Sequence, residues 1–292
     1  MRPLRGSRGE RSSAGAGVNR RVLITGGASG FGAALARIYA SRGDRVLVTD
    51  VRPSIDASEL PTAQGEGEVV YRALDVRDEE AWAAARDWVV EHWGGLDQLV
   101  NNAGVAAGGR IDVMPVADWE WIVDINLMGV VRGCRTFAPL LKSQGAGHIV
   151  NTASLAGLVH PPMMSSYNAV KAGVVALSET LLHELSAYGI TVSVICPSFF
   201  RTGLEQSLPG SDSAVEESAK TLIGQARNDA DTIASRVVPA LDKGRFLVLP
   251  DAQAQLVVRA KKYATRAYHF GMSRAGYRVA NKAAKRAGRG TL

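Results

Sequence analysis

Cysteine is almost absent from this chain of 292 residues, which contains only Cys134 and Cys196. Two cysteines are too few for the disulfide framework of a small secreted protein, and they lack the spacing of metal ligands. We therefore expect no metal site and a reducing, cytoplasmic compartment.

Long apolar runs are missing as well. No stretch approaches the ~18 apolar residues that a membrane-spanning helix needs, and the Arg-rich start lacks the apolar segment of a secretory signal. With 46% hydrophobic and 21% charged residues, the composition is that of an ordinary globular domain with a large buried core.

Acidic residues are absent from the end of the chain. Residues 252–292 contain ten Lys or Arg and no Asp or Glu, and residues 1–21 contain six Arg and one Glu. The net charges of these ends are therefore +5 for residues 1–21 and +10 for residues 252–292. Because the whole chain carries +6, the residues between them carry a net charge of −9. A basic groove in the fold is thus poorly supported, and no nucleic-acid partner is expected. We interpret residues 1–20 as a disordered basic lead.

From residue 21 onward, short β-branched apolar runs alternate with longer stretches of helical periodicity, which is the pattern of βαβ units. The apolar runs are continuous, as expected for strands that are covered on both faces. We therefore expect a single doubly wound, Rossmann-type α/β domain over residues 21–250, with a seven-stranded parallel sheet flanked by helices. The predicted strands are residues 21–25, 45–50, 69–74, 97–101, 148–154, 190–197 and 245–250, and the predicted helices are residues 31–42, 78–93, 118–142 and 166–188, with two shorter ones between 211 and 242.

Two further segments are defined by composition. Residues 198–227 are polar and follow a strand end, so we expect a substrate lid over the carboxyl edge of the sheet. Residues 251–292 form a basic, partly helical C-terminal extension. One apolar helical stripe is predicted in it, formed by Leu256, Ala260, Tyr263, Ala267 and Phe270.

A glycine-rich run, TGGASGFG at residues 25–32, directly follows the first predicted strand. Gly26, Gly30 and Gly32 are its important positions. A strand-to-helix turn of this kind needs residues that accept positive φ and let the backbone approach a pyrophosphate, whose charge then lies on the free N–H groups of the helix start. The spacing is G-x-x-x-G-x-G and not the common G-x-G-x-x-G fingerprint, and alone the run would indicate only a Gly-rich turn.

Carboxylates at the next two strand ends support a dinucleotide site. Asp50 ends the second strand, 18 residues after Gly32, where it can accept hydrogen bonds from both adenosine ribose hydroxyls. A 2′-phosphate there would meet like charge, which favours NAD over NADP, although Arg52 lies close enough to keep NADP as an alternative. Asp75 either bonds the adenine ring or, like Asp78, caps the following helix.

Tyr167 and Lys171 form a second motif at the start of an apolar helix. Residues four apart share one helix face. A tyrosine with its ordinary pKa of about 10 is a poor base at neutral pH, and a nearby ammonium favours the phenolate and lowers that pKa. We therefore predict Tyr167 as a general acid/base, although a single Tyr-x-x-x-Lys pair is common on helix surfaces.

Together these motifs resemble the short-chain dehydrogenase/reductase family, classical type, over about residues 21–250. TGGASGFG is similar to the family's TGxxxGxG loop, and NNAG at residues 101–104 matches its run after the fourth strand. Ser154 stands 13 residues before Tyr167 and Asn126 lies in the preceding long helix, as the family's active-site tetrad requires. The resemblance implies hydride transfer between NAD(H) and an alcohol or carbonyl. The cofactor-binding residues that it implies are Gly26, Ser29, Gly30, Phe31, Gly32, Asp50, Asp75, Val76, Asn102, Ala103, Gly104, Tyr167, Lys171, Pro197 and Thr202.

The resemblance also implies a role for each catalytic residue. Tyr167 donates or accepts the substrate proton, and Ser154 hydrogen-bonds the reacting oxygen and stabilises the charge that develops on it. Lys171 depresses the pKa of Tyr167 and holds the nicotinamide ribose. Asn126 anchors a water that links Lys171 to solvent.

One departure from the family pattern follows the sixth strand, where Pro-Gly is replaced by Pro197-Ser198. Because of Ser198, the fine shape of the nicotinamide pocket does not follow from the resemblance. Thr202 either bonds the carboxamide of the nicotinamide or caps the lid. We assign no role to His160. The residues expected around the reacting carbon are almost uncharged, which favours a bulky apolar alcohol or carbonyl substrate: Leu155, Val159, Met163, Met164, Phe199 and Phe200.

Three alternatives stay open from the sequence. The first is an NADP(H)-dependent ketoreductase of the same family. The second is a non-catalytic protein that senses NAD(H). The third concerns the extension, which is either solvated or makes a weak peripheral contact with anionic lipid. The resemblance further implies a homodimer or homotetramer, without fixing the number of subunits.

Overall fold

The computed structural model describes residues 19–286. The predicted disordered lead, apart from Asn19 and Arg20, and the last six residues of the extension lie outside this range. Strands and helices alternate within it, as the sequence predicts. The strands are β1 (Arg21–Thr25), β2 (Arg45–Asp50), β3 (Glu68–Ala73), β4 (Gln98–Asn101), β5 (Gly147–Thr152), β6 (Ile190–Ile195) and β7 (Leu247–Val248), and the helices are α1 (Gly30–Ser41), α2 (Glu79–Trp93), α3 (Val116–Val123), α4 (Gly129–Gln144), α5 (Ala156–Val159), α6 (Ser165–Leu185), α7 (Ser213–Gly224), α8 (Ala230–Asp242), α9 (Ala252–Tyr263) and α10 (Thr265–Arg286).

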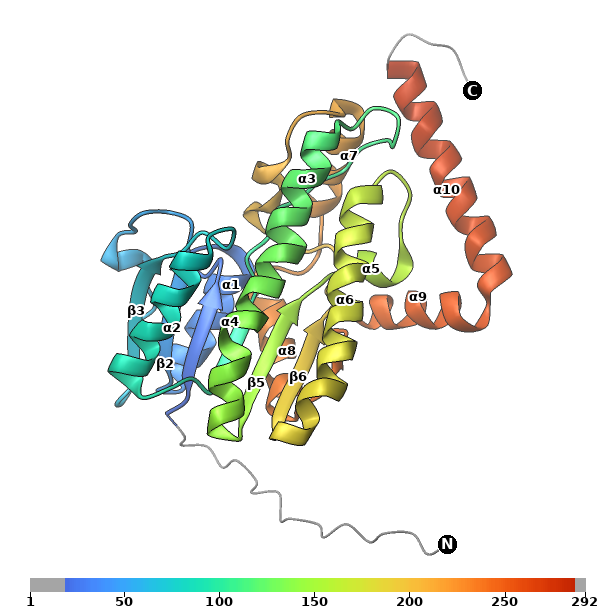
Figure 1. Ribbon diagram of the computed structural model, residues 1–292. Coiled ribbons are helices and arrows are strands. Elements are labelled where there is room, and N and C mark those ends of the chain that lie inside the picture. Colours follow the sequence, from blue (N-terminus) through green and yellow to red (C-terminus); the bar gives the residue numbers. More distant parts are fainter. Residues whose placement is uncertain (1–18, 287–292) are drawn as a thin grey trace, which may run out of the picture.

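The seven strands form one sheet in the order β3-β2-β1-β4-β5-β6-β7 (Figure 1). All six neighbouring pairs are parallel, which confirms the predicted doubly wound α/β fold. From β1 the chain first adds β2 and β3 on one side. It then crosses to β4, on the other side of β1, and adds β5, β6 and β7 outward from there. Ligands bind at such a switch point, at the carboxyl ends of the strands.

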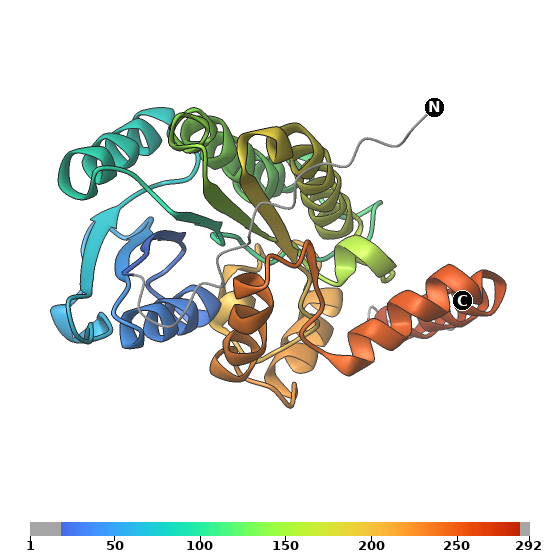
Figure 2. The ribbon, with the colours of Figure 1, turned by 90° about the horizontal axis from the view of Figure 1, so that it is seen from below.

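Alternating strand residues face two separate cores. In β2, Val46 and Val48 pack on one side of the sheet and Leu47 on the other, and all three are fully buried. One core lies between the sheet and helices α2, α4 and α6, and the second lies between the sheet and helices α1 and α8 (Figure 2). Because both faces are covered, the strands need the continuous apolar runs seen in the sequence.

Two elements differ from the sequence prediction. The helix expected over residues 118–142 is interrupted by a π-helical turn at Asp124–Met128, which separates α3 from α4. Turns of this kind are rare and concentrate at functional sites, and this one contains Asn126. The strand expected over residues 245–250 is reduced to β7, which lies at the edge of the sheet and pairs with β6 alone.

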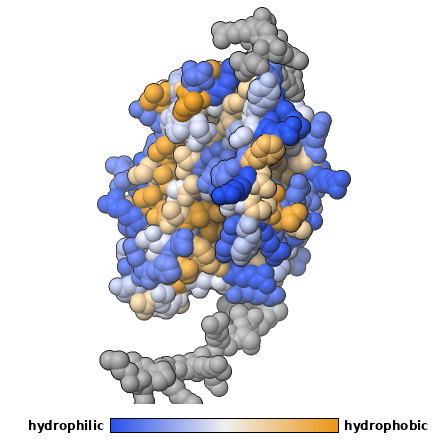
Figure 3. Space-filling model, turned by 90° about the vertical axis from the view of Figure 1, so that its right-hand side faces the viewer, coloured by the Kyte–Doolittle hydropathy of each residue, from blue (hydrophilic) through white to orange (hydrophobic). Residues whose placement is uncertain are grey.

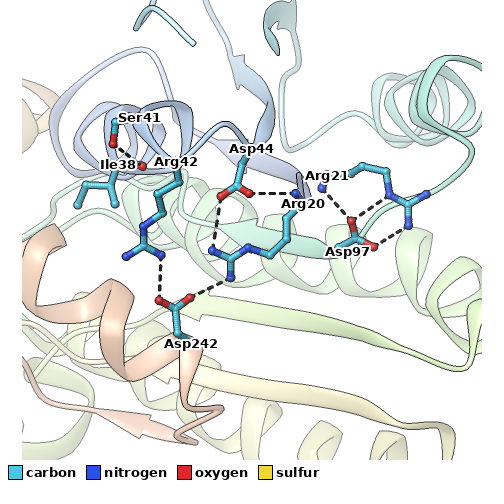
Figure 4. A network of polar contacts seen from close by, with 8 residues as sticks. All are labelled: Arg20, Arg21, Ile38, Ser41, Arg42, Asp44, Asp97 and Asp242. Carbon is cyan, nitrogen blue, oxygen red and sulfur yellow. Dashed lines mark hydrogen bonds and ion pairs between the residues drawn. The ribbon is translucent and has the colours of Figure 1, made fainter. Parts of the chain in front are cut away.

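Arg20 belongs to the folded domain, so the predicted lead extends too far (Figure 4). Its backbone N–H donates to the buried Asp44 carboxylate at 2.9 Å, and its guanidinium contacts Asp242 at 2.9 Å. Arg21, the next residue, pairs with Asp97 at 2.6 Å. The carboxylates of two other segments, Asp44 and Asp242, order Arg20, and the local composition of the lead gives no sign of them.

The described part of the extension, residues 251–286, contains two helices that meet at Ala264, whose backbone is not helical. The prediction of one apolar stripe is wrong, because the break at Ala264 divides it between two axes. Leu256, Tyr263 and Phe270 remain 66%, 77% and 64% exposed. Within residues 19–286, no helix is long and apolar enough to cross a membrane.

Candidate active site

The loop between β1 and α1 is built from close backbone contacts. Gly26 and Gly30 have φ values of 60° and 50°. A Cβ on Gly26 would lie 2.8 Å from the Ala103 Cα, and a Cβ on Gly32 would lie 2.2 Å from the Gly26 carbonyl oxygen. The side chain of Ser29 makes no capping hydrogen bond at the start of α1. The N–H groups of this helix end are therefore available to a phosphate.

The Asn-Asn-Ala-Gly run braces this loop from the side of β4. The Asn102 side chain donates to the carbonyl oxygens of Thr25 and Gly26 at 3.0 and 3.3 Å. In return, the Thr25 hydroxyl accepts the backbone N–H groups of Asn102 and Ala103. A Cβ on Gly104 would lie 3.0 Å from the Asn126 side-chain oxygen, so glycine permits the close approach of the two segments.

Asp50 lies beside the glycine-rich loop. Its carboxylate accepts the Ala28 and Arg52 backbone N–H groups at 3.3 and 3.4 Å. The Arg52 guanidinium is already engaged, because it binds Glu59 at 2.9 Å and the Ala28 carbonyl oxygen at 3.0 Å. Asp50 lines the cavity described below and Arg52 does not.

Asp75 and Asp78, for which adenine binding and helix capping were the alternatives, have different contacts in the structure. Asp78 caps α2 by accepting the Glu80 N–H at 2.8 Å. Asp75 lines the cavity next to Val76, and hydrogen bonds from the Arg77 side chain are the main cause that lowers the pKa of Asp75. Its carboxylate is thus ionised and tied to Arg77, at 2.6 Å.

A cavity of about 590 Å³ opens along the carboxyl ends of the strands. It joins the glycine-rich loop to the region of the proposed acid/base. Gly32 packs behind the loop and, like Tyr167, is not part of the lining. The predicted cofactor residues that line the cavity are Gly26, Ser29, Gly30, Phe31, Asp50, Asp75, Val76, Asn102, Ala103, Gly104, Lys171, Pro197 and Thr202.

Ser154, Tyr167 and Lys171 come together beside this cavity, and Lys171 is the one of the three that lines it. Ser154 follows β5, and Tyr167 and Lys171 lie in the first turns of α6. Tyr167 shares a hydrogen bond with Ser154. The Lys171 ammonium is 5.8 Å from the centre of the Tyr167 ring and donates to the Thr152 carbonyl oxygen at 3.0 Å.

The electrostatics of these residues differ from the prediction. Burial is the largest influence and raises the pKa of Tyr167, whereas the hydrogen bond with Ser154 opposes it. Burial also lowers the pKa of Lys171 to about 8. The expected lowering of the Tyr167 pKa by Lys171 is therefore wrong for the protein without cofactor, because desolvation disfavours the charged forms of both groups.

Asn126 lies fully buried in the π-helical turn. Its amide makes a two-sided clamp with Val105: the side-chain nitrogen donates to the Val105 carbonyl oxygen at 2.9 Å, and its oxygen accepts the Val105 N–H at 2.8 Å. Asn126 therefore fixes the loop after β4 against the helix that leads to the catalytic end of the cavity.

The predicted substrate residues are only partly present in the cavity. Of the six, Phe200 lines it, and its ring packs edge-on against Phe31 with 5.7 Å between centres. Several apolar side chains that sequence reasoning missed also line it, among them Trp121, Ile125 and Leu204. Trp121 and Ile125 are four residues apart and close to Asn126. This helical spacing is the sequence signal that could have identified them as site residues.

The lid region of residues 198–227 contains a short 3₁₀ turn, Gly203–Ser207, and α7. Thr202 both lines the cavity and caps this turn, by accepting the Leu204 N–H at 3.1 Å. Farther along, the buried Asp212 carboxylate binds Arg110 at 2.8 Å. These contacts hold the segment over the cavity.

The C-terminal extension reaches the catalytic end from outside. Lys261 donates to the Leu158 carbonyl oxygen at 2.5 Å and contacts the His160 ring nitrogen at 2.8 Å. The Tyr268 hydroxyl donates to the Val159 carbonyl oxygen. The loop between Ser154 and Tyr167 is thus supported by Lys261 and Tyr268, about a hundred positions away, which local sequence patterns do not identify.

Comparison with known proteins agrees with this geometry. The family model of short chain dehydrogenases matches residues 20–212. The CLA biosynthesis dehydrogenase/reductase of Lactiplantibacillus plantarum is 33% identical over 84% of this chain and 93% of its own length. A short chain dehydrogenase/reductase from Burkholderia phymatum, solved in complex with NAD, has a TM-score of 0.77 at 32% identity, covering 85% of this chain and 95% of its own.

A short-chain dehydrogenase from Sphingobium yanoikuyae, solved in complex with NADPH, has a TM-score of 0.67 at 25% identity and covers 87% of this chain and 94% of its own. Relatives of this fold thus hold either nicotinamide cofactor. The chain is an oxidoreductase of the alcohol/carbonyl type with a nucleotide-binding Rossmann fold, and it belongs to the short-chain dehydrogenase/reductase family.

Proposed function

We propose that the protein interconverts an alcohol and a carbonyl on a hydrophobic substrate with NAD(H), and that Tyr167 is its acid/base. The observation that carries this proposal is the meeting of Ser154 and Tyr167 with Lys171, which lines the same cavity as Asp50 and the glycine-rich loop.

The residues present fit a dinucleotide. The positive φ of Gly26 and the crowded position of Gly32 leave no room for side chains where a pyrophosphate would approach. Asp50 would accept the adenosine ribose hydroxyls. Because its carboxylate faces the cavity while Arg52 is held by Glu59, a 2′-phosphate would meet negative charge, which favours NAD.

The bound nicotinamide supplies or accepts the hydride. Burial keeps the Tyr167 phenol protonated at neutral pH, so it is a ready proton donor to the oxygen of a carbonyl substrate. Ser154 stabilises the charge that develops on that oxygen. In the oxidative direction the same phenol must first lose its proton, so oxidation is expected to rise with pH.

Lys171 and Asn126 support this proton transfer. The Lys171 ammonium, with a pKa of about 8, is still mainly protonated at neutral pH. Its bond to the Thr152 carbonyl oxygen uses one of three protons, which leaves donors for the nicotinamide ribose. Asn126 fixes the wall beside Lys171 through its clamp on Val105, and we propose that it also positions the relay water.

The substrate is expected to be apolar. Trp121, Ile125, Leu204 and Phe200 line the cavity. The Lys171 ammonium is already bonded to the Thr152 carbonyl oxygen and would hold the nicotinamide ribose, so a charged substrate would lose its hydration with little compensation. A bulky aliphatic or ring alcohol fits this lining.

Substitution of Tyr167 by Phe tests the acid/base. The ring remains and the hydroxyl is lost, so we expect kcat to fall by about 10²–10⁴-fold, while NADH affinity measured by fluorescence stays within about twofold. Tyr188→Phe, on a half-exposed tyrosine, is the matched control. Equal turnover in Tyr167→Phe would refute the mechanism, and NADH binding without turnover of any alcohol or ketone by the native chain would favour the sensor.

Cofactor choice has a separate test. Asp50→Ala should weaken NADH by about tenfold, the value of a charge-assisted hydrogen bond, and weaken NADPH less. Arg52→Ala should leave NADH affinity unchanged. If the native protein binds NADPH more tightly than NADH, the assignment of NAD is wrong.

A further inference from the structure

The junction of α9 and α10 forms a convex corner at the rim of the molecule (Figures 1 and 2). The proposed reaction uses no side chain on its outer surface. We call this surface the basic elbow. Its exposed side chains are Lys262, Tyr263, Arg266, Phe270 and Arg274.

Positive charge is concentrated in this part of the chain. Residues 252–292 contain ten Lys or Arg and no carboxylate side chain, and residues 22–251 carry a net charge of −9. Because no acid follows Asp251, the cations of the elbow meet no negative side chain from their own segment. Seen from this side, hydrophobic and strongly hydrophilic residues are interspersed over the surface (Figure 3).

Aromatic rings alternate with these cations. The Arg274 guanidinium lies 5.3 Å from the centre of the Phe270 ring, and the Lys262 ammonium lies 5.2 Å from that of Tyr263. Phe270 is 64% and Tyr263 is 77% exposed. Rings with cations beside them suit a bilayer interface, where the rings enter the acyl boundary and the cations remain among phosphates.

A groove of about 600 Å³ adjoins the elbow, between α9 and the edge strand β7. Arg245, Arg259 and Lys262 line it, together with Arg236, which pairs with Asp251 at 3.4 Å. Among the described residues that line this groove, none is a carboxylate. It therefore offers room and positive charge for anionic head groups next to the two rings.

The inner side of the same helices is fixed to the domain. Lys261 and Tyr268 bond the carbonyl oxygens of Leu158 and Val159. A Cβ on Gly276 would lie 3.4 Å from Pro162, so α10 packs closely on the same loop. The elbow is thus presented outward by a supported helix pair.

We propose that the basic elbow binds the surface of an anionic phospholipid bilayer. A second copy of the chain is disfavoured as the partner, since two elbows would bring like charges together. A nucleic acid is disfavoured because its extended, negatively charged backbone would also pass along the domain, whose net charge is −9. In addition, the exposed rings would gain little from contact with a duplex surface. A flat bilayer contacts the convex corner alone.

The test is co-sedimentation of the full-length protein with vesicles. Phosphatidylcholine vesicles with about a third phosphatidylglycerol should bind the protein at ~0.01 M salt and release it at ~1 M, where the Debye length falls from ~30 to ~3 Å. Pure phosphatidylcholine vesicles should bind much less. Inorganic phosphate at the same phosphorus concentration should not displace the protein.

Two variants locate the contact. Each cation near the surface contributes about a fivefold change in affinity, so the double reversal Arg266→Glu/Arg274→Glu should lower the vesicle affinity by on the order of a hundredfold or more. Phe270→Ser should lower it by roughly tenfold. Arg86→Glu/Arg135→Glu, on α2 and α4, changes the net charge equally and should have a far smaller effect.

Turnover of a water-soluble ketone, unchanged in the elbow variants, reports that they are folded. The proposal is overturned by absence of binding at low salt, by equal binding to neutral vesicles, or by equal loss in the Arg86/Arg135 control. It is also overturned if duplex DNA at the same phosphate concentration removes the protein from the vesicles, or if the elbow variants abolish self-association instead.

Discussion

The two halves of the cavity are built in different ways. The cofactor half rests on backbone geometry within two neighbouring strand ends, where Gly26 packs against the Ala103 backbone, Gly32 packs against the Gly26 carbonyl group, and Asn102 ties one loop to the next. The substrate half is assembled from segments far apart in the sequence. Its outer loop is held by Lys261 and Tyr268, about a hundred residues later.

This difference explains what each half can tolerate. In the cofactor half an added methyl group meets backbone, which cannot move without displacing a strand end. In the substrate half Lys261 and Tyr268 hold a loop through side-chain bonds to backbone carbonyl oxygens, so losing one bond shifts the loop without breaking the sheet. We expect substitutions to affect cofactor binding severely in the first half and the substrate KM moderately in the second.

The largest effect is expected at Gly32. In Gly32→Ala the new Cβ would lie 2.2 Å from the Gly26 carbonyl oxygen, so the glycine-rich loop must shift away from the pyrophosphate position. We expect NADH affinity, measured by fluorescence titration, to fall by more than about a hundredfold. Gly271→Ala, where nothing lies within 4 Å of the new Cβ, should leave it unchanged. Similar affinities in both variants would contradict the backbone account.

The same difference decides what could be predicted from sequence. The strands and the cofactor residues follow from short-range patterns, because continuous apolar runs and glycines at strand ends have local physical causes. The four-residue spacing of Trp121 and Ile125 is a local signal, whereas Leu204 lines the cavity through the folding of the lid, which no periodicity encodes. The Tyr167 pKa was predicted from one neighbour, whereas burial by the whole fold determines its direction.

The second largest effect is expected at Asp251, where the extension leaves the domain. Its buried carboxylate accepts Ser198 at 2.8 Å and Asn228 at 2.9 Å, and it joins a strand end, the lid and α9. Asp251→Ala leaves these donors unpaired, so we expect a loss of about 2–4 kcal/mol in the free energy of unfolding, measured by urea denaturation. Asp231→Ala, on an exposed ion pair with Arg37, should cost less than about 1 kcal/mol.

Comparable losses in these two variants would show that Asp251 does not organise the junction. The segments of the substrate half would then be held together by packing alone. The two halves of the cavity would differ only in the apolar side chains that line the substrate half.

A smaller effect is expected at Lys261. Lys261→Met keeps the apolar stem but removes the bond to the Leu158 carbonyl oxygen and the contact with His160. We expect KM for an apolar substrate to rise about three- to tenfold, a cost near that of one hydrogen bond, while kcat and NADH affinity stay constant. Lys262→Met, at the exposed neighbour, is the control, and Lys261→Arg should restore part of the KM. A fall in kcat without a rise in KM would assign Lys261 another role.

The smallest effect is expected at the amino edge of the sheet, where Asp97 meets Arg21 (Figure 4). Burial tends to raise the pKa of Asp97, but the hydrogen bonds from Arg21 outweigh it and the pKa is lowered. A carboxyl group whose folded pKa is depressed stabilises the protein above its unfolded pKa of about 3.9, and that contribution is lost as pH falls through the folded pKa.

Asp97→Asn should therefore lower the free energy of unfolding at pH 7 by at most about 1 kcal/mol, since the carboxylate side chain is 37% exposed and screened by salt. The difference from the native chain should shrink as pH falls below the unfolded value of about 3.9 and through the lowered pKa of the folded carboxyl group. Urea denaturation across this range measures it. Asp87→Asn, at an exposed pair with Arg86, should show almost no difference at any pH. If the difference in free energy of unfolding between Asp97→Asn and the native chain stays constant with pH, then shape and not charge matters at this edge. The edge would then resemble the cofactor half, which depends on backbone geometry.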